Sequence, residues 1–149
     1  MKRIAGVVRI VLTGAAASVA LWPVLSHAVP LDAQLDCRST GHAFIAPLLE
    51  NLYIEPEPMH VEANSINAFR PAKGIHLTAF DFHVYAVLGY EKDDPMFRQG
   101  SGQPIANSAY GAVVIGPTEA VEVRVRKAGS DAVVHHVTPF IIAIFCNVR

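Results

Sequence analysis

The chain has 149 residues, of which 52% are hydrophobic and 17% are charged, and its formal net charge is −1 at pH 7. This length allows one domain with a substantial hydrophobic core but not two ordinary domains. Because there is no excess of basic residues, the composition argues against nucleic acids and anionic membrane surfaces as partners.

The first 28 residues are typical of a cleavable signal peptide. Three of the 12 basic residues precede position 10, an apolar stretch spans 10–25, and no acidic residue precedes Asp32. Ser26 and Ala28 are the small side chains of a peptidase site, so we expect cleavage before Val29. The apolar stretch has about 16 residues, whereas a membrane-spanning helix needs about 20. We therefore expect a periplasmic or secreted domain, residues 29–149, with a net charge near −4 and no stable membrane insertion.

Two cysteines, Cys37 and Cys146, lie near the two ends of that domain. Outside the cytosol such a pair is expected to form a disulfide. The two residues lack the C-x-x-C spacing of a redox or metal pair, and no third metal ligand lies beside either one. Because bridged Cα atoms lie within about 7 Å of each other, the pairing predicts that the first and last strands are neighbours.

The first half of the domain contains few strong helix signals. A helix is expected only within 39–51, where Gly41 and Pro47 limit it to one or two turns. Apolar residues on both faces of 75–90 predict a long central strand, with a bulge or a bend because of its length. Shorter strands are expected at 59–64 and 110–115.

The last part of the chain reads as three strands. In 121–127, valines alternate with charged residues, which predicts a strand with one solvated face. After a turn it pairs with 132–138 as a hairpin, and the apolar run 140–146 follows as a buried strand. The domain is thus expected to be all-β and mainly antiparallel, a small β-sandwich or open barrel with at most one short helix.

The candidate catalytic residues are Asp81, His83 and Tyr85. They occupy every second position of the expected long strand and should therefore share one of its faces. An acid beside an imidazole is half of a catalytic arrangement, but no nucleophile motif accompanies it. A small envelope enzyme using Asp81 and His83 therefore stays an alternative function, as does a metal-binding protein. Its ligands would come from six histidines, with Met59 and Met96 as soft ligands for copper: His42, His60, His76, His83, His135 and His136. The spacing does not concentrate these residues, so we expect no metal site and no cofactor.

Two segments combine aromatic and charged residues as recognition surfaces do, namely 64–70 and 90–98. The acidic part of the second segment lacks the residue order of a calcium-binding loop. We expect these segments to bind another envelope protein, as an inhibitor, an immunity-type protein or an accessory subunit would. The candidate binding residues are Asn64, Asn67, Phe69, Arg70, Tyr90, Asp93, Asp94, Phe97 and Arg98.

Export can be tested by fluorescence, because Trp22 is the only tryptophan and belongs to the predicted leader. We expect protein recovered after export to emit with the spectrum of tyrosine only. The full-length precursor, kept in the cytosol, is the control that should show tryptophan emission. A tryptophan band from the exported protein would contradict cleavage.

Overall fold

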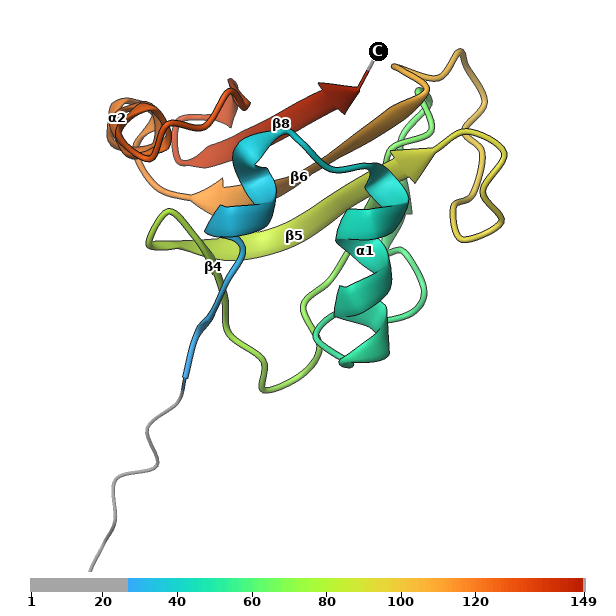
Figure 1. The fold of residues 1–149 in the computed structure, drawn as a ribbon, viewed down its shortest axis with the longest axis horizontal. Coiled ribbons are helices and arrows are strands. Elements are labelled where there is room, and N and C mark those ends of the chain that lie inside the picture. The colour runs from blue at the N-terminus through green and yellow to red at the C-terminus, as the bar shows by residue number, and fades with distance from the viewer. Residues whose placement is uncertain (1–26, 149) are drawn as a thin grey trace, which may run out of the picture.

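A computed structural model describes residues 27–148, so the predicted leader lies outside the described residues except for its last two positions. The described part is mostly strand, with helices gathered on one side of a sheet (Figure 1). None of its helices has the length and apolar character needed to cross a membrane. The helices are the 3-10 helix η1 (Asp32–Asp36), α1 (Gly41–Glu50) and α2 (Thr118–Lys127). The strands are β1 (Val29–Pro30), β2 (His60–Val61), β3 (Asn67–Phe69), β4 (Leu77–Ala79), β5 (Phe82–Glu91), β6 (Ser108–Ile115), β7 (Val133–Thr138) and β8 (Ile141–Val148).

These eight strands form one open mixed sheet in the order β1-β4-β5-β6-β8-β7. β3 also pairs with β5, and β2 pairs with β3. Every pairing is antiparallel except that of β1 with β4. Neither the sandwich nor the open barrel is confirmed by this arrangement. The expectation of at most one short helix is wrong, because two α-helices of ten residues each are present.

The region expected to be one long strand, 75–90, is a hairpin made of β4 and β5. Phe80 and Asp81 form its two-residue turn, and both have positive φ, 51° and 68°. Such a turn matches the twist of the flanking strands, although it more often contains glycine or asparagine. Asp32 supports it by accepting a hydrogen bond from the Phe80 amide at 2.8 Å. The expected bulge is also present, between Val84 and Ala86.

The prediction of a strand at 121–127 is wrong, since this segment lies in α2. Val121 and Val125 are fully buried, whereas Val123 is 64% exposed. Two valines four residues apart fit one face of a helix as well as one face of a strand, so the alternation alone was ambiguous. Charge favours the helix: Glu119 lies in its first turn, and the last turn is basic. The expected hairpin partner, β7, pairs with β8 instead.

Helix α1 is longer than the sequence suggested. Thr40 caps its start, accepting a hydrogen bond from the Ala43 amide at 3.2 Å. Gly41 is required by a close approach, because a Cβ there would lie 2.2 Å from the carbonyl oxygen of Tyr90 on β5. Pro47 removes one hydrogen bond within the helix. Buried apolar side chains on the same helix, each worth about 1.5–3 kcal/mol when fully buried, offset that loss.

The hydrophobic core lies between the sheet and the helices. Phe44 of α1 packs against Tyr110 of β6, with ring centroids 4.9 Å apart. Burial raises the pKa of the Tyr110 phenol, and the nearby Asp36 carboxylate raises it further, although a hydrogen bond from the Ser39 amide acts in the opposite direction. The strand residues buried against the helices include Leu77, Val84, Val87, Ala112, Val114, Ile142 and Ile144.

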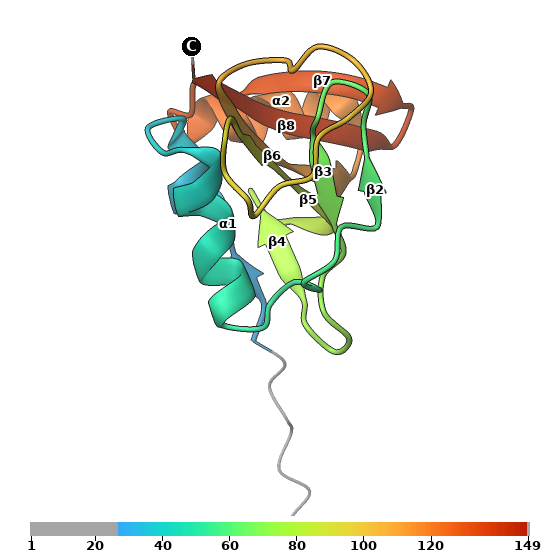
Figure 2. The ribbon, with the colours of Figure 1, turned by 90° about the vertical axis from the view of Figure 1, so that its right-hand side faces the viewer.

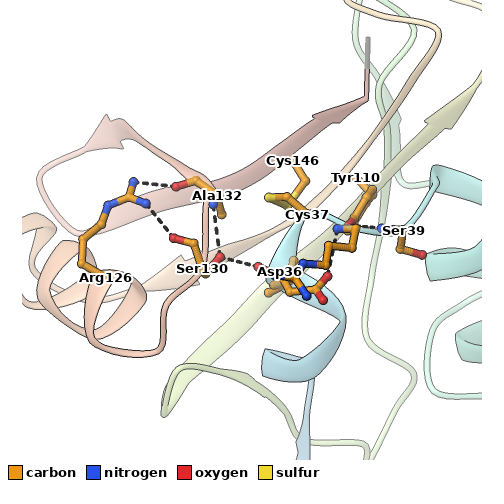
Figure 3. The surroundings of a disulfide bond; sticks show 10 residues. Asp36, Cys37, Ser39, Tyr110, Arg126, Ser130, Ala132 and Cys146 are labelled. Carbon is orange, nitrogen blue, oxygen red and sulfur yellow. Dashed lines mark hydrogen bonds between the residues drawn. A yellow bond between two sulfur atoms is a disulfide. The ribbon is translucent and has the colours of Figure 1, made fainter.

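The predicted disulfide is confirmed: Cys37 and Cys146 are bonded, with their Cα atoms 5.1 Å apart (Figure 3). It joins the loop after η1 to β8 rather than joining two terminal strands. The expectation that the first and last strands are neighbours is wrong, because β1 pairs with β4. Beside the bridge, the Ser130 hydroxyl donates a hydrogen bond to the Leu35 carbonyl of η1. The loop after α2 is thereby held against η1.

Replacing Cys37 and Cys146 together by alanine should lower the free energy of unfolding by roughly 4 kcal/mol, because a long loop is no longer closed in the unfolded chain. Urea denaturation measures this difference. The wild-type chain in reducing buffer is the control and should lose a similar amount. A loss of less than about 1 kcal/mol in both would contradict a stabilising bridge.

Candidate binding groove

The helices pack against one face of the sheet. The opposite face, here called the second face, is covered by no helix in the part of the chain that the structure describes. On β8, Ile142 and Ile144 point into the core, so Ala143 and Phe145 point the opposite way. Figure 2 shows α1 on one side of β5 and β6, with the β2–β3 hairpin on the other. This second face is hollowed into a groove.

The groove has a volume of about 860 Å³ and crosses the sheet from β2 to β7. Ala86 of β5 pairs with Val113 of β6, which pairs with Ala143 of β8 and, through it, with His135 of β7. Residues on these four neighbouring strands thus form one continuous row. The small side chains at Ala86 and Ala143 leave room above the sheet, and larger residues line its ends.

Gly111 allows a close approach of β6 to β8 beneath this groove. A Cβ at this position would lie 2.1 Å from the carbonyl oxygen of Ile144, a separation that no side chain tolerates. A glycine inside a strand often marks such an approach of two backbones. The bulge beside Tyr85 adds twist to β5, so both irregularities act on the same stretch of sheet.

The groove gathers apolar side chains that face solvent. Of the eight exposed large hydrophobic residues among residues 27–148, four line it: Tyr85, Ile105, Val133 and Val137. Val133 and Val137 are 58% and 54% exposed, and both belong to β7. Single exposed apolar residues are normal on a protein surface, but several that share one concave surface mark a binding site.

Polar side chains stand on the β2–β3 side of the groove. His60 and Glu62 form an exposed pair, with Nε2 and Oε1 3.3 Å apart. Arg70 contacts the Met59 sulfur at 3.9 Å. Within the described residues no carboxylate lies within 4.0 Å of the Arg70 guanidinium. The groove thus has an apolar floor and a charged margin on one side.

The two segments proposed for binding, 64–70 and 90–98, lie side by side. The Asn67 carboxamide accepts a hydrogen bond from the Arg98 amide at 2.9 Å and donates one to the Arg98 carbonyl at 2.8 Å. The Ser65 hydroxyl accepts one from the Gly100 amide at 2.9 Å. These contacts fix the loop after β5 against the β2–β3 hairpin, and Ile105 of that loop lines the groove.

The nine candidate binding residues divide by burial. Four are buried and hold the fold together: Asn67, Phe69, Tyr90 and Phe97. Of the other five, Asp94 is paired with His42 and Arg98 with Glu57, and Asp93 is exposed. Only Asn64 and Arg70 of the nine line the groove. The sequence thus found one margin of this surface but not its floor.

The three candidate catalytic residues do not share a strand face. Asp81 lies in the β4–β5 turn and pairs with Arg124 of α2. His83 is exposed on β5, and Tyr85 lies at the bulge, where it lines the groove. Among residues 27–148 no group of three or more His, Cys, Asp or Glu side chains is placed to hold a metal ion.

The sequence predicts the strand that became β8, part of the floor of the groove, but not the environment of both its faces. Apolar residues on both faces of 140–146 predicted a strand buried on both sides. β8 is instead buried against helices on one face and lines the groove with the other.

Comparison with protein-family models, curated proteins and solved structures gave no match to this chain.

Replacing Asn67 by alanine should lower the free energy of unfolding by roughly 2–3 kcal/mol, since it leaves the Arg98 amide and carbonyl without their partner. The amides of Arg98 and Gly100 should also exchange with solvent faster. Asn64→Ala is the matched control, because the side chain of Asn64 accepts only a long 3.3 Å hydrogen bond, from the Ile66 amide. Equal losses in both variants, measured by urea unfolding and amide exchange, would contradict an anchoring role for Asn67.

Proposed function

We propose that this chain is an exported binding domain that holds an apolar segment of another envelope protein in its groove. The observation that carries the proposal is the uncovered apolar face of the sheet. A domain of this size ordinarily buries such a face against a second layer. The described helices cover only the opposite face, and a partner would complete the packing on this one.

Export is supported by the leader-like N-terminus and by the Cys37–Cys146 bridge. Disulfides persist in oxidising compartments and are rare in the cytosol of most organisms. In the periplasm or outside the cell, the partner would be another envelope protein. An inhibitor, an immunity-type protein and an accessory subunit all act by such contact.

The energy of binding would come from apolar burial. Tyr85, Val133 and Val137 are each about half exposed, and covering such a side chain contributes on the order of 1 kcal/mol. The small residues of the floor allow a partner's side chains to descend between the larger residues at the ends. The charged margin at Arg70 would orient a partner that carries an acidic group beside its apolar segment.

A photo-crosslinking residue in place of Tyr85 should form an adduct with the partner protein in intact envelopes. The same residue in place of Leu52, which is 73% exposed, follows α1 and does not line the groove, should not. Adding Ala143→Phe fills the centre of the groove and should abolish the Tyr85 adduct. The melting temperature of this variant shows whether its fold is retained.

An adduct that persists with Ala143→Phe, or one of equal yield at Leu52, would refute binding in the groove. The mass of the adduct identifies the class of ligand. A shift of a few hundred daltons would indicate a small molecule and would overturn the proposal of a protein partner. Ala143→Ser is a second variant that leaves the groove open and should retain the adduct.

A further inference from the structure

Strand β7 is the one long edge of the sheet within the described residues. It pairs with β8 on one side only, and no described strand lies on its other side. At the opposite end of that order lies β1, which has two residues, one of them Pro30. β7 has six residues, five of them exposed. Alternate N–H and C=O groups along such an edge are free to pair with another strand.

β7 lacks most of the features that keep edges apart. Proteins usually protect an edge with charged residues, proline or a covering helix. The strand reads Val-Val-His-His-Val-Thr, with no acidic residue, lysine, arginine or proline. α2 lies beside the Val133 and Val134 end of the strand, where the two elements line a hollow. A bulge after His136 is the only protection that the strand itself carries.

The strand is complementary to itself in an antiparallel arrangement. A two-fold axis perpendicular to the sheet keeps the same face of both copies on the same side, so paired residues share a face. With His135 on the axis, Val133 of each copy lies opposite Val137 of the other, and His135 lies opposite its own copy. The exposed valines would then cover each other, and no carboxylate, lysine or arginine would lie opposite its own copy.

We propose that two copies of this chain pair through β7, in this register, to form one continuous sheet. Val133, His135 and Val137 are also the groove residues of β7, so the two grooves meet at the axis and form one longer surface. Beside the edge, α2 presents Glu122, Val123 and Arg126. Because Glu122 and Arg126 carry opposite charges, this surface has no excess of one charge that would repel the same surface of a second copy. Because Val133 and Val137 belong to both surfaces, the pairing is tested on the chain without a partner in the groove.

An interface made by a single pair of short strands is small, so we expect weak association. It can be measured by sedimentation of the purified, disulfide-bonded chain at concentrations from about 1 µM to 1 mM. We expect a reversible monomer–dimer equilibrium. In a mixture of isotope-labelled and unlabelled chains, nuclear Overhauser contacts should join Val133 of one copy to Val137 of the other. Within one copy these residues are about 13 Å apart along the strand, too far for such a contact.

Charge exchange at position 135 tests the register. Both His135→Glu and His135→Lys should raise the dissociation constant about tenfold, because each places like charges opposite each other. A one-to-one mixture of the two variants should restore association to the wild-type level. The matched control is the pair His76→Glu and His76→Lys, at an exposed histidine next to β4, which should change nothing.

A chain that stays monomeric up to about 1 mM would overturn the proposal, and the edge would then be left for a strand of a different protein. Restoration by the mixed variants at position 136 instead of 135 would overturn the register. Dimers that persist in both single variants at position 135 would place the interface elsewhere. Circular dichroism of each variant shows that loss of association does not reflect loss of the fold.

Discussion

The covalent link between Cys37 and Cys146 is the constraint on which the arrangement of this domain depends. It fixes the loop between η1 and α1 to β8. On either side of that loop, Leu35 of η1 and Phe44 of α1 are buried in the core. The Ser39 amide bonds to the Tyr110 hydroxyl, and Ser130 bonds to Leu35, so the N-terminal helices are held by three separate contacts. All three hold them on one face of the sheet, which leaves the other face for the groove.

The division into a covered and an uncovered face explains which residues are available for function. Strands in the middle of the sheet alternate between core and groove, so a side chain that lines the groove is next in sequence to one that fixes the core. The groove rests on a floor held by β5, β6 and β8, the three longest strands. Its margins are the β2–β3 hairpin, the loop after β5 and the edge strand β7. The rigid part therefore supplies shape, and the margins supply polar groups.

The sequence correctly predicted those features whose residue pattern is compatible with only one kind of structure. The disulfide followed from two cysteines in a chain with an export signal, and β6 and β8 followed from apolar runs of strand length. Alternating valines at 121–127 were ambiguous, since residues four apart share a face in a helix and in a strand alike. The β4–β5 turn was missed because Phe80 and Asp81 are unusual at positive φ. The groove was missed because which of two apolar faces stays uncovered depends on where distant helices pack.

The disulfide closes most of the described chain into one covalent ring. The two sulfurs are separated by 109 positions, and the packing of η1 over the sheet beside β8 holds Cys37 and Cys146 at bonding distance. Once formed, the bond locks this arrangement, because the unfolded chain that carries it has fewer conformations. A reduced chain has to find its strand order through hydrophobic burial and backbone pairing alone, and most of these pairings join segments far apart along the chain.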